Sequence, residues 1–364
     1  MKREPGRSDQ GVKDRADGKG ERERVPVAFV PEMYDELLLS ELCGTAVYTY
    51  DTIGPTRTIA EPLRDFFSRG GKGLRARLFN LILDVFDAPE RDYQDLMWVV
   101  EMSHSGTLII DDIEDGSTHR RGKPCIHQLY GTDVAMNAGN ALYFLSLLPL
   151  IEKRGLLNET MRSRLFEIYT RCMINLHFGQ SMDIAWRRGL TKLEDITEGK
   201  YLEMCRLKTG SLYRMSAEMA GVLANCSEGS REALGRFGSA IGTAFQIQDD
   251  LLDLQSGPFA KAKGGRGKDI TEGKITLMVI HALRCAEDKD RERLKSILAL
   301  NTEDPVLIRE AISIMRASGS LAYASCRASQ ILDEACVHLF RVLPNGSAVR
   351  KVRVFAESFV RRKL

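Results

Sequence analysis

The sequence lacks the features that mark disulfide-rich, zinc-binding and membrane-spanning proteins. Its eight cysteines are scattered over 364 residues, with no CxxC pair and no histidine spacing that would hold zinc. Such cysteine usage is typical of a reduced intracellular chain, so we expect a cytoplasmic location. The apolar run at residues 141–151 is too short to cross a bilayer. It predicts a buried helix and no integral membrane segment.

The sequence also lacks an excess of charge of either sign. Its 52 Lys and Arg residues nearly balance 50 Asp and Glu residues, which leaves a formal net charge of +2. This balance gives no general attraction for nucleic acid, and no such partner is expected. Residues 1–30 are highly charged without an apolar segment, so they predict a disordered tail and no targeting presequence. Residues 31–364 are expected to form one domain.

Strand-like alternation is rare, and apolar residues instead recur at intervals of three and four. The sequence therefore predicts an all-α fold, a large single-domain bundle in which several helices are apolar on most faces. The expected helices are 32–50, 74–86, 93–115, 135–153, 160–187, 196–224, 231–254 and 271–286, followed by shorter ones from 288 onward. Loops are expected at 70–72, 116–118 and 257–269.

Two clusters of carboxylates interrupt this apolar pattern. Asp111, Asp112 and Asp115 stand at positions i, i+1 and i+4, and the triad is repeated as Asp249, Asp250 and Asp253. Residues four apart share a helix face, where like charges repel. Carboxylates inside an apolar helix need cations, and their hard oxygen atoms suit Mg²⁺, which shares its ligand shell with phosphates. The two triads therefore predict a Mg²⁺-dependent diphosphate site.

Basic residues near the first triad supply the complementary charge. Lys72 and Arg75 follow a double glycine at the start of a helix, a place that favours anions. Arg120 and Arg121 come directly after the first triad. His104 lies seven residues before Asp111 and on the same side of that helix. Each of these residues alone is compatible with ordinary surface or core packing, but together they favour phosphate binding.

These motifs resemble those of the trans-isoprenyl diphosphate synthases, the polyprenyl synthetase family. The likeness runs from about residue 70 to residue 274. It is carried by GGKGLR (70–75), EMSHSGTLIIDDIED (101–115), RRGKP (120–124), HFGQSMD (177–183), KTG (208–210), FQIQDDLLD (245–253) and GKDITEGK (267–274). Gly73 and Ala76 depart from residues that are frequent in the family. The resemblance implies a bundle of long helices around a central active-site cavity, the isoprenoid synthase fold, and a homodimer.

The resemblance also implies roles for individual residues. A metal site with three Mg²⁺ ions would use Asp111, Asp112, Asp115, Asp249, Asp250 and Asp253. Lys208 would act beside Asp111, Asp112, Asp115 and Asp249 in catalysis. Isopentenyl diphosphate would be bound by Lys72, Arg75, His104 and Arg121. The allylic diphosphate (dimethylallyl, geranyl or farnesyl diphosphate) would be bound by Arg120, Lys208, Thr209, Gln246, Lys274 and one of Lys261, Lys263 and Lys268, for which Lys263 is the candidate.

The length of the product depends on the cavity beyond the first triad. Gly106 and Thr107, one turn before Asp111, are small and are not expected to block the growing prenyl chain at this depth of the cavity. Tyr143, Phe144 and His177 resemble the residues that close the cavity at a deeper level, its floor, in eukaryotic-type members of the family. Aromatic residues at helical positions also serve ordinary core packing. With this floor, geranylgeranyl diphosphate, with twenty carbons, is the expected main product.

Two alternatives are considered. A class I terpene cyclase also ionises a prenyl diphosphate with helix-borne aspartates, but it has no isopentenyl diphosphate site, which the set Lys72, Arg75, His104 and Arg121 indicates here. A non-catalytic modulating subunit could lose an acidic triad, whereas this chain keeps both.

Overall fold

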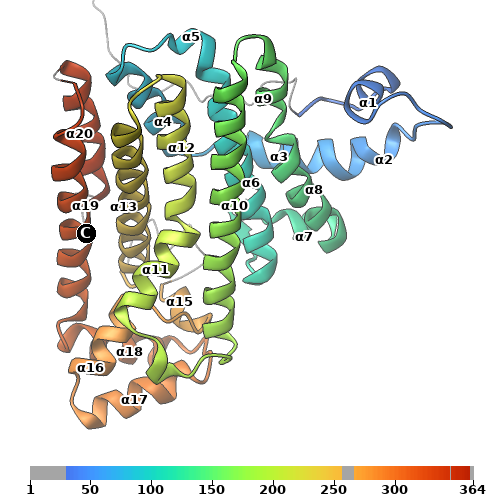
Figure 1. Ribbon diagram of the computed structural model, residues 1–364. Helices are drawn as coiled ribbons and strands as arrows, with labels where there is room; N and C mark the ends of the chain where they lie inside the picture. Colours follow the sequence, from blue (N-terminus) through green and yellow to red (C-terminus); the bar gives the residue numbers. More distant parts are fainter. Residues whose placement is uncertain (1–29, 256–265, 345, 361–364) are drawn as a thin grey trace, which may run out of the picture.

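Helices make up nearly all of the described chain, as the apolar periodicity predicts (Figure 1). The structure is a computed structural model and describes residues 30–255, 266–344 and 346–360. The α-helices are α1 (Glu36–Cys43), α2 (Ile53–Pro55), α3 (Glu61–Ser68), α4 (Leu74–Val85), α5 (Glu90–Tyr93), α6 (Met97–Glu114), α7 (Ile126–Tyr130), α8 (Thr132–Leu145), α9 (Leu148–Glu152), α10 (Glu159–Arg187), α11 (Glu198–Lys208), α12 (Gly210–Leu223), α13 (Glu228–Asp253), α15 (Lys268–Thr271), α16 (Leu277–Cys285), α17 (Asp288–Leu298), α18 (Pro305–Ala317), α19 (Ser320–Phe340) and α20 (Ser347–Val360).

Short elements complete the described chain. The π-helix η1 (Thr56–Ala60) precedes α3, and 3₁₀ helices occur at η2 (Gln94–Leu96), η3 (Lys153–Gly155) and η4 (Leu193–Asp195). Two antiparallel strands of two residues, β1 (His119–Arg120) and β2 (Lys123–Pro124), form a hairpin directly after α6. This hairpin turns the chain sharply, so that the basic residues following the first triad come back beside it.

The central layer consists of long helices that run side by side. In Figure 1, α10, α12 and α13 stand next to each other, with α19 and α20 along one side and α16, α17 and α18 at one end. Helix α12 packs against α13, α10 and α4, while α6 packs against α8. Nearly every residue of α12 is buried, as expected for a helix that is apolar on most faces. The functional residues lie on the helices of this layer and on α6.

N-cap side chains fix where several helices begin. Asn158 Oδ1 accepts a hydrogen bond from Met161 N at 2.8 Å at the start of α10, and Thr197 and Ser227 cap α11 and α13. Each of these caps satisfies a backbone N–H group that has no partner inside the helix. Helix α4 begins differently, because its Gly73 has a φ of 55° and offers no side chain. There Glu101 Oε1 of α6 accepts from Ala76 N at 3.0 Å.

Four of the predicted helices are shorter or interrupted, and the one predicted as 271–286 begins only at Leu277. The first ends at Cys43, because Gly44 adopts a φ of 89°. The segment predicted as 196–224 is divided at Thr209 into α11 and α12. The segment predicted as 135–153 is divided near Ser146, whose hydroxyl donates to Tyr143 O at 3.1 Å. Residues 257–265 of the loop predicted at 257–269 lie outside the described residues, and Lys268 and Asp269 at its end are helical, in α15.

The stretch Thr132–Gly155 is the helical segment that is long and apolar enough to cross a membrane, within the ranges that the structure describes. This is weak evidence for a membrane span, because core helices of soluble proteins pass the same test. Here the stretch comprises α8, α9 and η3, and Ala135, Ala138 and Leu142 are fully buried. The absence of an integral membrane segment remains a prediction.

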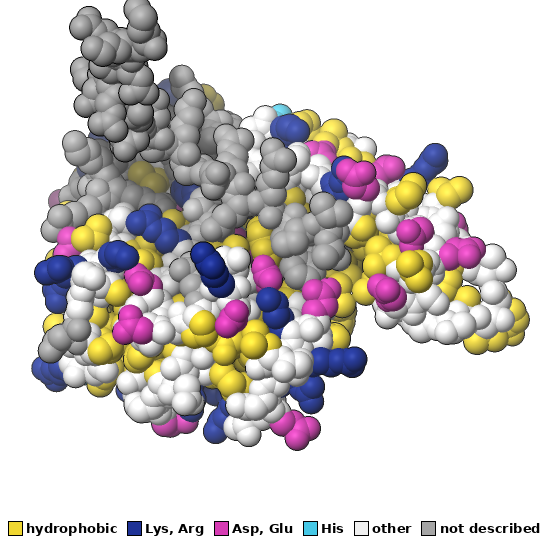
Figure 2. All heavy atoms as spheres, turned by 90° about the horizontal axis from the view of Figure 1, so that it is seen from above, with side chains coloured by type: hydrophobic (Ala, Val, Ile, Leu, Met, Phe, Trp, Pro, Cys, Tyr) yellow, Lys and Arg dark blue, Asp and Glu magenta, His cyan; other side chains and the backbone are white. Residues whose placement is uncertain are grey.

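The segment that carries α1 and α2 projects from the bundle (Figure 1). Helices α1 and α2 lie at the far right of Figure 1, and Figure 2 shows the same lobe with exposed hydrophobic atoms on it. Tyr34, Leu39 and Ala60 form a small cluster of their own, apart from the main core. This lobe does not contribute to the cavity described below.

Candidate active site

A cavity of about 260 Å³ opens between α6, α8, α10, α11, α12 and α13. Its lining includes Arg75, His104, Thr107, Asp111, Glu114, Asp115, Arg120, Arg121, Tyr143, His177, Gln180, Lys208, Thr209, Gln246, Asp249, Lys268, Asp269, Glu272 and Lys274. Ion pairs with Lys208 and Lys274 connect the lining carboxylates Asp111, Asp115, Asp269 and Glu272, and this part of the lining is called the acidic end. Tyr143, Leu176, His177 and Leu212 are lining residues from neighbouring helices. Such a cavity can hold a molecule with an anionic head and an apolar chain.

The first triad divides between the cavity and its wall. Asp111 and Asp115 line the cavity, as their spacing on α6 predicts. Asp112 does not line it: its side chain is buried, and Arg120 Nε donates to Asp112 Oδ1 at 2.8 Å. A helix rotates by about 100° per residue, so neighbouring aspartates face different surroundings. The structure thus places Asp112 as the buried partner of Arg120, next to the two aspartates at the cavity.

The second triad divides in the same manner. Asp249 lines the cavity, whereas Asp250 and Asp253 are buried in its wall. Asp250 accepts hydrogen bonds from Tyr201 Oη at 2.7 Å and from Gln246 Nε2 at 2.8 Å. Asp253 Oδ2 accepts from Asp269 N at 3.1 Å. The contact of Asp250 with Tyr201 connects α13 to α11, and the contact of Asp253 with Asp269 connects α13 to the segment that carries Lys268 and Lys274.

Cations surround the two cavity-lining aspartates of α6. Lys208 Nζ lies 3.2 Å from Asp111 Oδ1, and Lys274 Nζ lies 3.5 Å from Asp115 Oδ2. Burial alone would raise the pKa of Asp111, but Lys208, Lys274 and Arg120 outweigh it and lower that pKa. Burial and the charge of Asp111 raise the pKa of Asp115 to about 6. Repulsion between the carboxylates therefore persists despite the nearby cations.

Helix α10 contributes residues whose roles the sequence did not predict. Gln180 Nε2 donates to Asp111 Oδ1 at 3.1 Å, and Asp183 Oδ2 accepts from Lys208 Nζ at 2.7 Å. Arg187 Nη1 lies 2.7 Å from Asp115 Oδ1. Gln180 and Asp183 belong to the motif HFGQSMD, and Arg187 follows four residues later. Their i, i+3 and i+7 spacing puts all three on one side of α10. This spacing is the sequence feature from which their common role could have been predicted.

Lys208 is positioned by a close approach of α10 and α11. A Cβ atom on Gly179 would lie 2.3 Å from Lys208 N, so only glycine permits this contact. The chain then bends at Thr209, whose Oγ1 donates to Gln246 Oε1 at 2.7 Å. A Cβ atom on Gly242 of α13 would lie 2.5 Å from Gly210 Cα. The interruption between α11 and α12 is therefore packed tightly on both sides.

A second basic group lies around the start of α4 and the hairpin. Arg75, His104 and Arg121 line the cavity, and the guanidinium of Arg75 stacks on the ring of Tyr213 at 4.4 Å. Burial, with Arg75 and Arg121 nearby, lowers the pKa of His104 well below its usual range. Lys72 is exposed and is not a lining residue. The structure thus brings together three of the four residues predicted for isopentenyl diphosphate.

The segment after α13 closes the acidic end. Lys274 Nζ lies 2.6 Å from Glu272 Oε2 and 3.4 Å from Asp269 Oδ1, and all three residues line the cavity. Lys268 also reaches the cavity, where its Nζ donates to Ser117 Oγ at 3.1 Å. Lys261 and Lys263 lie outside the described residues.

The residues predicted to control chain length fall into two groups. Thr107, Tyr143 and His177 line the cavity, and the rings of Tyr143 and His177 meet edge to face at 5.6 Å. Gly106 is instead packed against α8, where an added Cβ would lie 2.7 Å from Gly139 O. Phe144 is 74% exposed on the outside of α8. The structure does not bring Gly106 and Phe144 to the cavity.

The carboxylates fit a divalent ion that shares its ligands with a substrate. Among the described residues, no three His, Cys, Asp or Glu side chains converge into a ready-made metal cage. Asp115 Oδ1 is buried and accepts no hydrogen bond from any described group, although Arg187 forms an ion pair with it. A buried carboxylate oxygen of this kind is suited to a cation. Mg²⁺ characteristically combines one or two carboxylates with phosphate oxygens and water.

Comparison with known proteins agrees with the fold and identifies the family. The polyprenyl synthetase family model matches residues 56–315. The chain is 34% identical over 286 residues to the geranylgeranyl pyrophosphate synthase janG of Penicillium janthinellum, covering 79% of this chain and 74% of that protein. It is 35% identical to geranylgeranyl pyrophosphate synthase 2 of Zymoseptoria tritici over 279 residues, covering 75% and 80%.

Solved structures show the same architecture. The geranylgeranyl pyrophosphate synthetase of Pyrococcus horikoshii superposes with a TM-score of 0.76 at 29% identity, covering 85% of this chain and 91% of that one. The geranylgeranyl pyrophosphate synthetase of Geoglobus acetivorans superposes with a TM-score of 0.74 at 27% identity, covering 90% of this chain and 97% of that one. An all-α fold with carboxylates and cations around one cavity thus defines the class of isoprenyl diphosphate synthases. The chain belongs to the polyprenyl synthetase family, and it is a trans-prenyltransferase.

Proposed function

We propose that this protein condenses isopentenyl diphosphate head-to-tail with an allylic diphosphate, in the presence of Mg²⁺, and that its main product is geranylgeranyl diphosphate. The observation that carries the proposal is the pairing of two basic groups within one cavity: Lys208 and Lys274 beside the aspartates, and Arg75, His104 and Arg121 beside the start of α4. Two diphosphates have separate sites there, and a terpene cyclase would need only one. The relatives are named for the same product.

At the acidic end, the residues promote the departure of pyrophosphate from the allylic diphosphate. Asp111, Asp115 and Asp249 would hold Mg²⁺, which supplies positive charge that stabilises the leaving pyrophosphate. Lys208, Lys274 and Arg120 line the same region and would neutralise its oxygen atoms. Asp112, Asp250 and Asp253 would act from the wall, because they position Arg120, Gln246 and the segment before Lys274.

Beside the start of α4, the residues position isopentenyl diphosphate. Arg75 is held by Tyr213, and a neutral His104 can donate one hydrogen bond to a phosphate oxygen. Lys72, at the exposed edge, would join from the loop. A substrate held there is presented to the allylic cation for bond formation, which is mainly a matter of orientation. Thr209 and Gln246 would face that cation with oxygen dipoles, and the apolar lining would exclude water.

The prenyl chain would extend toward Tyr143 and His177. This edge-to-face pair on α8 and α10 lies beyond Thr107 and would form the floor that limits the product to twenty carbons. The expected setting is a cytoplasmic homodimer. All eight cysteines are free thiols, as in proteins of a reducing compartment, and large apolar side chains remain exposed on α8 and α10.

Product analysis with the purified chain tests this proposal. Isopentenyl diphosphate should be consumed with dimethylallyl, geranyl or farnesyl diphosphate when Mg²⁺ is present and not when EDTA removes it. Chromatography of the dephosphorylated prenols should show geranylgeraniol. Asp249→Ala should lower turnover by about 100-fold or more without unfolding the protein. Cyclic hydrocarbon formed from a single allylic diphosphate would favour a terpene cyclase, and no product under any condition would favour a non-catalytic subunit.

A further inference from the structure

Arg187 forms an ion pair with the first acidic cluster and does not itself line the cavity. It is the last residue of α10, and its side chain is only 11% exposed. Its Nη1 lies 2.7 Å from Asp115 Oδ1, and its Nε lies 3.9 Å from Asp183 Oδ1. Arg187 is not a lining residue of the cavity. It is therefore an ion-pair partner of the carboxylates that has no access to a substrate.

Carboxylates outnumber cations in this region, because Lys274 also pairs with Asp269 and Glu272. The four carboxylates of Asp111, Asp112, Asp115 and Asp183 each have a cation within 4.0 Å, and the cations are Arg120, Lys208, Lys274 and Arg187. Three of these cations line the cavity and can turn to a diphosphate. Arg187 does not line the cavity, and its guanidinium is held by Asp115 and Asp183. Burial would lower the pKa of Arg187, but Asp115 and Asp183 outweigh it and raise that pKa, so its charge is permanent.

We propose that Arg187 is a positioning residue that serves as the fixed counter-ion of Asp115 and Asp183, stabilises the metal-free enzyme and keeps divalent ions weakly bound until a diphosphate arrives. The inference rests on the proposed function, in which Asp115 binds Mg²⁺. A divalent ion that approaches Asp115 meets a carboxylate whose charge is already compensated, so its Coulomb attraction is reduced. The diphosphate engages Lys208, Lys274 and Arg120 and adds negative charge, which restores that attraction.

Removal of the Arg187 guanidinium should lower the stability of the metal-free protein and raise the affinity of the protein for Mg²⁺. In the metal-free protein, Asp115 keeps only Lys274 at 3.5 Å, so a buried carboxylate loses its nearest cation and the fold becomes less stable. In the presence of Mg²⁺ alone, one additional negative charge attracts the ion. A residue that merely holds α10 in place would lower stability without increasing the response to Mg²⁺.

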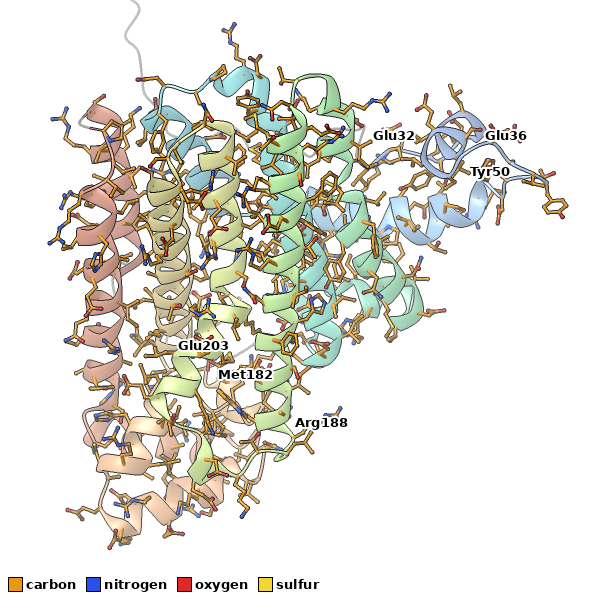
Figure 3. The ribbon with its side chains drawn as sticks, in the orientation of Figure 1. Glu32, Glu36, Tyr50, Met182, Arg188 and Glu203 are labelled. Atoms are coloured by element: carbon orange, nitrogen blue, oxygen red, sulfur yellow. The ribbon has the colours of Figure 1, made fainter. Side chains whose placement is uncertain are left out.

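Arg188 provides a matched control. It is the next residue in the chain, it is exposed, and Figure 3 shows its side chain at the end of α10, directed away from the bundle. Arg187→Gln and Arg188→Gln remove the same charge from the same helix end. Thermal unfolding of the full chain would be followed without substrate, first in EDTA and then across a MgCl₂ titration at constant ionic strength.

We expect Arg187→Gln to unfold at a lower temperature in EDTA. Its half-maximal stabilisation by Mg²⁺ should occur at about tenfold lower concentration than in the wild type or in Arg188→Gln. Equal half-maximal concentrations in all three proteins would refute the counter-ion role and leave the metal site itself supported. If Mg²⁺ stabilised none of them, even with inorganic pyrophosphate, the proposed metal site and this inference would both be wrong.

A second pair of variants covers the case in which Arg187→Gln does not fold. Asp183→Asn removes one carboxylate, and Asp183→Asn combined with Arg187→Gln removes one carboxylate and one cation. The double variant should bind Mg²⁺ about tenfold more tightly than Asp183→Asn alone, because it lacks the cation that opposes a divalent ion at Asp115. No difference between these two variants would contradict the inference.

Discussion

At the scale of single residues, the floor of the cavity depends on two rings from different helices. Tyr143 comes from α8 and His177 from α10, and His177 Nδ1 lies 2.8 Å from Met173 O, which fixes the orientation of its ring. Neither ring belongs to the acidic end. Their size can therefore be changed without altering the residues assigned to the diphosphates.

We expect the double variant Tyr143→Ala and His177→Ala to form prenols longer than twenty carbons, because the chain can pass the former floor. Thr107→Phe should shorten the product to fifteen carbons, since its ring would fill the cavity one turn from Asp111. Chromatography of the dephosphorylated products measures both changes. Phe144→Ala is the control, because its exposed ring does not line the cavity. An unchanged product from the double variant would place the floor elsewhere.

His104 should make stability depend on pH. Burial, with Arg75 and Arg121 nearby, lowers its pKa in the folded protein, whereas the unfolded chain has a pKa of about 6.5. The unfolded state then binds the proton first, so stability is lost as pH falls below about 6.5, by at most about 1.4 kcal/mol per pH unit. His104→Gln should lose less stability between pH 7 and pH 5 in chemical denaturation. Parallel curves for the two proteins would show that His104 is protonated when folded.

The sequence could predict which residues carry the chemistry better than it could predict where their side chains point. Repeated i, i+1, i+4 spacing identified both triads, and Asp111, Asp115 and Asp249 do line the cavity. The same spacing could not show that Asp112 faces Arg120 or that Asp250 faces Tyr201, because those partners are distant in the chain. Arg187 was missed for the same reason, since its partner is Asp115 of another helix.

At the scale of elements, helix existence was predictable and helix interruption was not. The apolar period continues across Thr209, so the segment 196–224 predicts one helix, yet α11 and α12 are separate. The interruption depends on close contacts with other helices, at Gly179 of α10 and at Gly242 of α13. Nothing within the segment itself signals those neighbours. The bend matters because it brings Lys208 and Thr209 to the cavity.

Gly179→Ala tests the contact between α10 and α11. The new Cβ would lie 2.3 Å from Lys208 N, a backbone atom, so the helices must separate. Overpacking of this kind costs about 1–3 kcal/mol, and the displaced Lys208 should also lower turnover. Gly229→Ala, where an added Cβ meets no atom within 4 Å, should retain stability and activity. Denaturant unfolding and turnover would be compared, and a stable, active Gly179→Ala would refute this role for the glycine.

At the scale of the whole molecule, the outer faces of α8 and α10 carry more apolar surface than a monomer needs. Phe144 is 74% exposed and Phe178 is 66% exposed, each next in the chain to a residue of the Tyr143–His177 pair. Because those two rings touch, the helices adjoin at this level and the phenylalanines lie on their outer sides. Met136 and Ile174 extend the exposed apolar surface along the same helices. We therefore place the contact of the proposed homodimer here.

Phe144→Glu combined with Phe178→Glu should convert the dimer to a monomer, because charged groups in an apolar contact must be desolvated without partners. Light scattering during gel filtration should give twice 40.8 kDa for the wild type and 40.8 kDa for the double variant. Val306→Glu, on α18 and also exposed, is the matched control and should remain dimeric. A wild-type mass of one chain would refute the homodimer, and a dimeric double variant would move the contact away from α8 and α10. Since Tyr143 and His177 are the chain neighbours of these phenylalanines, the monomeric variant should also give a broader distribution of product lengths.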